Sequence, residues 1–252
     1  MKKEEPLKTA EEILGEVEKA SKSEMNEKIL ANAVEALVKA GRLDLAKKTL
    51  KRMRNSYWRS TTLKTLLSKL LESGEIDESR RIIEKTLELA GEIKDVFLYV
   101  RTLVNISEAF AEIDCEERGS DVVKKALEVI KETKDTGNLL TILPHIVKVL
   151  AQTGNINKAQ EEANGIEDDH RRSLAFKYLV QSFAGRGEIN EALKFTDRIK
   201  DGEHRSRAYM YIGLALLRAK RADEARKIAK KIRNPYWRSH ILKWSKRIGK
   251  SN

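Results

Sequence analysis

Four arginines recur in the same short context along the chain, and a guanidinium group binds carboxylates, phosphates and peptide carbonyls. They are Arg59, Arg172, Arg205 and Arg238, in the segments SYWRS, HRRS, EHRS and PYWRS. The last three are 33 residues apart, and Arg59 lies 113 residues before Arg172, the length of one 33-residue and two 40-residue repeats. All four therefore share one position in a repeating unit.

Two roles are open for these arginines. A cation in the first turn of a helix opposes the macrodipole at a cost of roughly a few tenths of a kcal/mol, so its repetition needs a compensating contact. In the structural interpretation, each arginine reaches the preceding unit and bonds a carbonyl or a carboxylate there. In the functional interpretation, they form a ladder with rungs ~10 Å apart that binds an acidic peptide or a phosphate backbone. We expect the structural role first and ligand binding second.

Further basic residues follow these arginines in a constant phase. Lys64, Lys177 and Lys243 each lie five residues after a repeated arginine, and Arg247 lies nine residues after Arg238. Because the phase is shared, we expect these side chains on one exposed face, where they could hold a carboxylate-rich ligand. The alternative is a face of solvated lysines with no ligand.

The net charge of +11 is concentrated near the C-terminus. Residues 201–252 contain 15 Lys and Arg against 4 Asp and Glu, whereas residues 1–200 contain 35 of each sign. Arg226, Lys230 and Arg233 are spaced to form a basic stripe on one helix. Such a stripe is either a solvated face or a surface for acidic proteins, nucleic acid or anionic lipid. We predict that this region is the dominant anion-binding surface.

Tyrosine and tryptophan pairs precede two of the arginines, at Tyr57-Trp58 and Tyr236-Trp237. We expect these aromatic side chains to pack as wedges between units. The alternatives are a stacking surface for nucleic-acid bases or a hot spot for a bound peptide.

Catalytic motifs are poorly represented. The four histidines form neither an H-x-x-x-H nor an H-E-x-x-H spacing, and no G-x-S-x-G or Gly-rich phosphate loop is present. Asp168-Asp169-His170 has the composition of a loop with capping acids rather than of a metal site. The single cysteine, Cys115, excludes an intrachain disulfide. We therefore expect no enzymatic activity, no cofactor and no metal.

A repeated phrase indicates the elements that position these residues. It reads GRLDLA, GEIDES, GNINKA, GEINEA and KRADEA, beginning at positions 41, 74, 154, 187 and 220. The glycine predicts a left-handed helix end, and the small residue that closes the phrase predicts close approach of two helices. The Asp or Asn three residues after the start predicts the N-cap of the next helix, at Asp44, Asp77, Asn157, Asn190 and Asp223.

The repeat period predicts stacked helix pairs. A capping box from Thr9 to Glu12 begins a first helix that runs to about Ala20, in an N-terminal half-unit of residues 1–22. Six pairs follow within 23–233, at 23–54, 55–94, 95–134, 135–167, 168–200 and 201–233. A capping helix in 234–252 is expected to dock through Ile241, Trp244 and Ile248. The prediction is a single all-α solenoid of about fourteen helices without strands.

One segment resembles the tetratricopeptide repeat. The run RAYMYIGLALLRAKRADEARKIAKKIRNP carries matching residues at Tyr209, Ile212-Gly213, Ala225, Ala229 and Pro235. The chain departs from that family in its period of 33 rather than 34 and in the missing aromatic residue of most first helices. The resemblance implies a right-handed superhelix of antiparallel helix pairs, with the first helices lining a concave binding surface.

Composition completes the expectations. No apolar run approaches the ~18 residues of a membrane span, so we expect a soluble cytoplasmic protein. Charged residues make up 35% of the chain, a bias typical of thermophilic prokaryotes.

The leading hypothesis is a non-enzymatic scaffold that binds an acidic protein or peptide through the concave face and the basic C-terminal region. The alternative is an RNA- or DNA-binding repeat protein, and both a monomer and an end-to-end dimer are open.

Overall fold

The described part of the chain is all-helical. The computed structural model describes residues 12, 15, 24–73, 76–133 and 137–248. Apart from residues 12 and 15, the helix expected at Thr9–Ala20 lies outside them. The α-helices are α2 (Glu24–Lys39), α3 (Leu43–Arg52), α4 (Ser56–Ser73), α5 (Ile76–Ala90), α6 (Val96–Glu112), α7 (Glu116–Glu132), α8 (Leu143–Gln152), α9 (Ile156–Gly165), α10 (Asp169–Gly185), α11 (Ile189–Thr196), α12 (Gly202–Arg218), α13 (Ala222–Ala229) and α14 (Pro235–Ile248). A 3-10 turn, η1 (Leu139–Thr141), precedes α8. Two of these helices lie in each of the six segments predicted as pairs, and α14 lies in 234–252.

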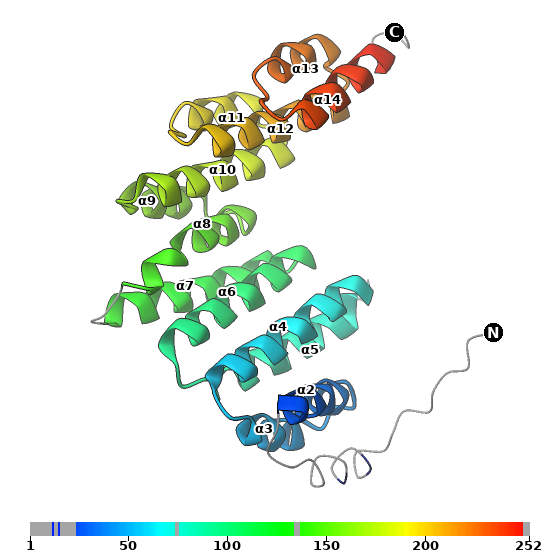
Figure 1. Cartoon of the computed structure of the whole chain (residues 1–252), viewed down its shortest axis with the longest axis vertical. Coiled ribbons are helices and arrows are strands. Elements are labelled where there is room, and N and C mark those ends of the chain that lie inside the picture. Colours follow the sequence, from blue (N-terminus) through cyan, green and yellow to red (C-terminus); the bar gives the residue numbers. More distant parts are fainter. Residues whose placement is uncertain (1–11, 13–14, 16–23, 74–75, 134–136, 249–252) are drawn as a thin grey trace, which may run out of the picture. The chain divides into compact units, whose positions relative to one another are not determined.

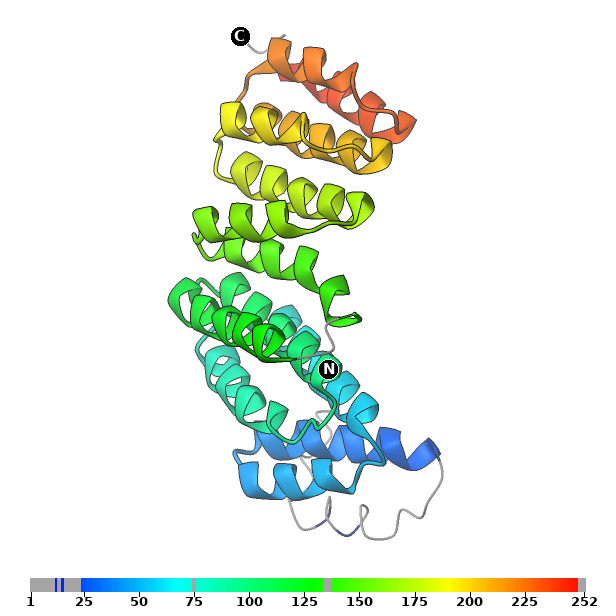
Figure 2. The same cartoon turned by 90° about the vertical axis from the view of Figure 1, so that its left-hand side faces the viewer.

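The chain divides into two compact units, Met1–Lys134 and Asp135–Asn252. In the first unit, α2, α4 and α6 are the first helices of three pairs, and α4 packs against α6. In the second unit, α10 packs between α8 and α12, and α12 packs against α14. Figures 1 and 2 show the antiparallel pairs within each unit. The single continuous solenoid and its handedness stay predictions.

Left-handed residues end the first helices, as the repeated phrase predicts. Gly41, Gly154 and Gly187 have φ angles of 77°, 75° and 79°, and Lys220 has 57° in the same position. The next amide bonds back across the helix end, as Arg42 N does to the Leu37 carbonyl at 2.8 Å. This bond satisfies a carbonyl that the helix leaves free. It requires a positive φ at the residue before the bonded amide, which glycine adopts most readily.

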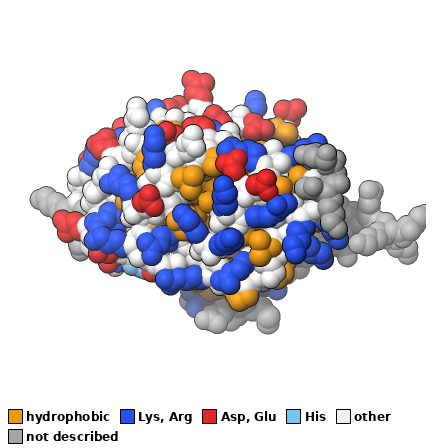
Figure 3. Space-filling model, turned by 90° about the horizontal axis from the view of Figure 1, so that it is seen from above, with side chains coloured by type: hydrophobic (Ala, Val, Ile, Leu, Met, Phe, Trp, Pro, Cys, Tyr) orange, Lys and Arg blue, Asp and Glu red, His pale blue; other side chains and the backbone are white. Residues whose placement is uncertain are grey.

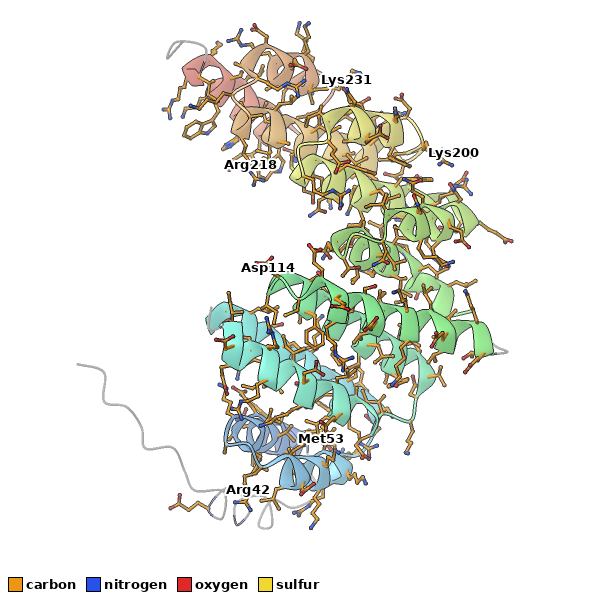
Figure 4. The ribbon with its side chains drawn as sticks, turned by 180° about the vertical axis from the view of Figure 1, so that it is seen from behind. Arg42, Met53, Asp114, Lys200, Arg218 and Lys231 are labelled. Carbon is orange, nitrogen blue, oxygen red and sulfur yellow. The ribbon has the colours of Figure 1, made fainter. Side chains whose placement is uncertain are left out.

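Asp114 marks a copy of the phrase that the sequence pattern does not reveal. Its φ is 56°, and the Cys115 amide bonds the Phe110 carbonyl at 2.9 Å. It lies 40 residues after Gly74 and 40 before Gly154, in the turn between α6 and α7 that Figure 4 labels. Gly119 is then the small residue of this copy, and it is buried. The 80-residue gap therefore holds two repeats of equal length.

The predicted N-caps of the second helices are wrong by two residues. Helix α3 begins at Leu43 and α13 at Ala222, so Asp44 and Asp223 are the second helical residues of their helices. Asp77, Asn157 and Asn190 are displaced in the same way. The back-bonded turn explains the shift, because it brings the chain into the next helix directly after the left-handed residue. Asp223 still interacts favourably with the helix dipole, because its negative charge lies in the first turn.

Side-chain caps lie instead on the first helices. In each of these caps, an Asp or Asn oxygen accepts the backbone N–H group of the residue three positions later. Where the helix carries a repeated arginine, the capping residue lies four positions before it. The bonds run from Leu98 N to Asp95 at 2.8 Å, from Arg171 N to Asp168 at 2.7 Å and from His204 N to Asp201 at 2.8 Å. Asn55 and Asn234 accept the Trp58 and Trp237 amides, each at 3.2 Å. Of this second series, only the capping acids at Asp168-Asp169 were predicted from the sequence.

Small residues allow the helices to pack closely. The residues that close the phrase are all buried: Ala46, Ser79, Ala159, Ala192 and Ala225, which confirms that expectation. At the C-terminal helix, the buried Ile241 packs on Gly213 of α12, where an added Cβ would lie 2.5 Å from its Cδ1.

One expected contact of α14 is wrong. Trp244 is 43% exposed, and Ser245 is buried in its place. The buried face runs through Ile241 and Ser245, one turn of helix apart, and this turns Trp244 outward.

Candidate partner-binding surface

Arg59 is held by backbone carbonyls of its neighbours in the first unit. It lies in the first turn of α4 and donates to the carbonyls of Leu50 at 3.2 Å, Lys51 at 3.2 Å and Met53 at 3.4 Å, at the end of α3. Its Nη1 also donates to the Glu92 carbonyl at 2.8 Å, just after α5. The guanidinium therefore satisfies carbonyls that a helix end leaves free.

Two of the remaining repeated arginines make the equivalent contact in the second unit. Arg172 Nη1 donates to the Ile166 carbonyl at 2.9 Å, and Arg238 Nε donates to the Ile232 carbonyl at 2.8 Å. Each acceptor lies six residues earlier and belongs to the preceding pair, as the structural interpretation predicts. Arg205 differs, because its side chain makes no hydrogen bond among the described residues. Three guanidinium groups are thus occupied by protein carbonyls, which argues against a free ladder.

Lys177 is not a solvated lysine. It lies on α10 and is only 6% exposed, so the prediction of an exposed side chain is wrong here. Its Nζ lies 3.9 Å from the ring centroid of Tyr178, and it forms no ion pair with any described residue. The side chain of lysine has an apolar stem, so burial of its methylene groups is favourable. The ammonium group is left without a carboxylate.

Other cations surround this ammonium group. Lys148 of α8 lies 5.9 Å from the same Tyr178 ring, and Arg207 of α12 also acts on Lys177 through its charge. Burial, followed by the charges of Arg207 and Lys148, lowers the pKa of Lys177 from 10.5 to about 8. The sequence reading missed Lys148 and Arg207, although each lies about one repeat from Lys177. Three first helices thus place positive charge around one point.

A groove lies beside this cationic cluster, between α12 and α14. Its volume is ≈ 230 Å³, and it is lined by Glu203, Ser206, Arg207, Met210, Tyr211, Ile232, Asn234 and Trp237. Arg207 belongs to both features and is paired with Glu203, with Nε 3.1 Å from Oε1. The groove therefore combines an aromatic wall with a cation, Arg207, whose charge acts on Lys177.

The predicted basic stripe of the last pair is not one continuous exposed surface. Arg226 is half-buried and donates to Asp223 at 2.7 Å and to the Ser245 carbonyl at 3.2 Å. Lys230 and Arg233 are both exposed, and the Arg233 guanidinium lies against the backbone of Gly202. Figure 3 looks down on the end of the second unit and shows Lys and Arg side chains spread between apolar ones. In Figure 4, Lys200 lies in the loop before α12, and Arg218 is the last residue of that helix.

The other predicted binding residues lie at the surface. Lys64 of α4, and Lys243 and Arg247 of α14, are exposed. The Arg247 guanidinium carbon lies 5.0 Å from the Trp244 ring centroid, which orders it beside an aromatic surface. The first unit contributes Lys64 alone to this set, so the structure gathers the others in the second unit.

The aromatic pairs do not pack as wedges throughout. Tyr57 is 54% exposed and Tyr236 is 68% exposed, whereas the adjacent tryptophans are half-buried. Tyr236 and Trp237 stack edge to face at 5.2 Å, and His240 lies 5.7 Å from Trp237. Helix α14 therefore presents an aromatic row to solvent next to Lys243.

The described helices define a protein built from stacked antiparallel helix pairs. No protein-family model matches the chain, and no curated protein matches it in sequence. Among solved structures, the chain is similar to a Thermococcus onnurineus protein, with 15% identity over 96% of each chain and a TM-score of 0.34. It is also similar to a signal transduction ATPase with numerous domains and a tetratricopeptide repeat sensor from Pyrococcus horikoshii, with 16% identity and a TM-score of 0.39. That match covers 96% of this chain and 40% of the ATPase.

Within the described residues, no helix has both the length and the hydropathy to cross a membrane.

Proposed function

We propose that this chain is a non-enzymatic interaction module that binds an acidic protein or peptide through the first helices of its second unit. The observation that carries this proposal is Lys177, a buried ammonium group surrounded by cations and without a carboxylate. Burial of an unpaired charge is costly, and like charges nearby add to that cost. A carboxylate from a partner would offset both.

The surroundings of Lys177 suit an acidic peptide. The groove next to Arg207 offers the aromatic side chains of Tyr211 and Trp237 to an apolar residue of the ligand, and aromatic residues are enriched at binding hot spots. The exposed Lys230, Lys243 and Arg247 add long-range attraction, which raises association rates of oppositely charged partners. The ligand would thus be attracted by exposed charges and held at the buried one.

A binding measurement tests this proposal. A fluorescein-labelled peptide rich in Glu, with one aromatic residue, is titrated with the chain while fluorescence anisotropy is recorded. The titration is repeated at about 50, 150 and 500 mM NaCl, a range in which the Debye length passes through ~8 Å. Parent protein is compared with Lys177→Met and Arg207→Gln. Each variant is expected to bind at least about 10-fold more weakly, the loss typical of removing one charge-assisted contact.

The matched control is Lys194→Gln. Lys194 is on α11, a second helix, and pairs with Glu191 at 2.6 Å, so its loss removes the same charge from another face. An equal loss of affinity in this control would show that the affinity depends on net charge alone and not on the position of Lys177. Undiminished binding of the peptide by Lys177→Met would overturn the proposal.

The same assay includes single-stranded RNA and duplex DNA of equal charge. Nucleic acid that binds more tightly than the peptide, with a steep log–log salt dependence, would replace the proposed function by the nucleic-acid alternative. We expect weaker binding of both, because three of the four repeated arginines are engaged by protein carbonyls.

A further inference from the structure

Two histidines that are 34 residues apart meet at the loop end of the second unit. His170 is in the first turn of α10 and His204 in the first turn of α12, and their ring centroids are 4.8 Å apart. Asp201, the N-cap of α12, lies beside both. One nitrogen of each histidine and one carboxylate oxygen all lie within 4.8 Å of one another. The sequence predicts a capping loop rather than a metal site at Asp168-Asp169-His170, because the histidines form no H-x-x-x-H or H-E-x-x-H spacing.

Asp201 divides its two oxygens between different tasks. Oδ1 accepts the backbone N–H groups of Glu203 at 2.9 Å and His204 at 2.8 Å. Oδ2 lies 3.3 Å from Nδ1 of His170. The Asp201 amide is itself bonded to the Ser173 hydroxyl at 3.1 Å. The carboxylate is therefore held in place by both neighbouring helices, with Oδ2 directed at the histidines.

His204 has an unsatisfied ring. Both of its nitrogens, Nδ1 and Nε2, are buried and have no hydrogen-bond partner. Buried polar atoms are nearly always paired in folded proteins, and an unpaired one destabilises the folded state. A metal ion bound to one nitrogen would satisfy it, and imidazole is the commonest nitrogen ligand of metals in proteins.

We propose that His170, His204 and Asp201 form a zinc site that links the first helices of two successive pairs. Two imidazoles and one carboxylate suit Zn²⁺, whereas Mg²⁺ and Ca²⁺ prefer oxygen ligands alone. The ligands come from α10 and α12, so the ion fastens one pair to the next. A fourth position is left open to water or to a ligand.

The surrounding charges are compatible with a dication. Asp168, Asp169 and Glu203 lie in the same two helix starts and are negative. Lys200 is neutralised by Asp169, at 3.1 Å, and Arg207 is paired with Glu203. Three positive neighbours have no ion pair among the described residues: Lys177, whose charge acts on His204, and Arg171 and Arg205, which follow the two histidines in the sequence.

Isothermal titration of the metal-free full chain with ZnCl₂ tests the site. We expect about one Zn²⁺ per chain and a rise of several degrees in the thermal midpoint, as binding to the folded state alone requires. His170→Ala and Asp201→Asn should each weaken Zn²⁺ binding at least about 10-fold. Neither change should unfold the chain, because His170 is exposed and an Asn retains the capping oxygen.

The control is His145→Ala, which removes an exposed histidine of α8 outside the cluster and should leave Zn²⁺ binding unchanged. Cobalt substitution gives a second readout, since d–d absorption bands of Co²⁺ in the parent should be lost in His204→Ala. Absence of Zn²⁺ binding by the parent would overturn the site. Equal binding by the parent and His170→Ala would overturn it as well.

Discussion

The guanidinium of Arg59 donates to the carbonyl of Glu92, 33 residues further along the chain, at 2.8 Å. The same group bonds three carbonyls at the end of α3. One side chain in the first turn of α4 therefore holds the ends of two second helices, α3 and α5. This is the largest set of contacts made by any of the four repeated arginines.

Replacement of Arg59 by Met should destabilise the first unit by about 1.5–3 kcal/mol, because partly buried carbonyls lose a charged donor. Arg205→Met is the matched change, since it removes the same group from a side chain without a hydrogen bond among the described residues, and should cost less than about 0.5 kcal/mol. Urea unfolding followed by circular dichroism measures both. Equal losses would show that the carbonyl contacts contribute little.

Asp201 and Asp223 test the corrected position of the caps. Asp201→Ala removes an oxygen that accepts two backbone N–H groups and should cost about 1 kcal/mol. Asp223 has an 85% exposed side chain and pairs only with Arg226 in its own helix, so Asp223→Ala should cost roughly a few tenths of a kcal/mol. Thermal unfolding in the presence of a chelator isolates the caps from metal effects. A larger loss of stability in Asp223→Ala than in Asp201→Ala would show that the N-caps lie where the repeated phrase predicts them.

Lys177→Met should raise the free energy of unfolding at neutral pH, because it removes a buried unpaired charge and keeps the apolar stem. The folded pKa of about 8 lies below the ordinary 10.5, so the unfolded chain binds more protons between these values. Stability of the parent relative to the variant should therefore rise as pH increases from 8 to 10.5, by on the order of 1–3 kcal/mol. A pH-independent difference between the two proteins would contradict this assignment.

Charge reversal at Lys230, Lys243 and Arg247 should slow association with an acidic peptide and leave the thermal midpoint nearly unchanged, since all three side chains are exposed. The effect should shrink above ~0.15 M salt, where the Debye length falls to ~8 Å. Arg226→Glu should instead destabilise the last pair, because it places a second carboxylate beside Asp223 and frees the Ser245 carbonyl. Stopped-flow anisotropy and differential scanning calorimetry separate the two effects.

The helix pairs of this protein follow from residue patterns along the chain. Local rules of helix ends act over a few residues, so Gly41, Gly154 and Gly187 predict the turns, and Ala225 predicts a close packing point. The same locality explains the wrong caps, because a shift of two residues depends on the back-bonded turn rather than on residue type. It also explains why Asp114 was overlooked, since an Asp occupies the position of a Gly.

Tertiary structure alone decided the environment of each charged side chain. Lys177 and Lys243 share one phase in the repeat, yet the first is buried between neighbouring helices and the second is exposed on the last helix. His170 and His204 meet only because consecutive pairs stack in register. Burial and charge proximity depend on neighbours that lie about one repeat away, and a periodic pattern specifies the phase of a residue but not what is packed against it.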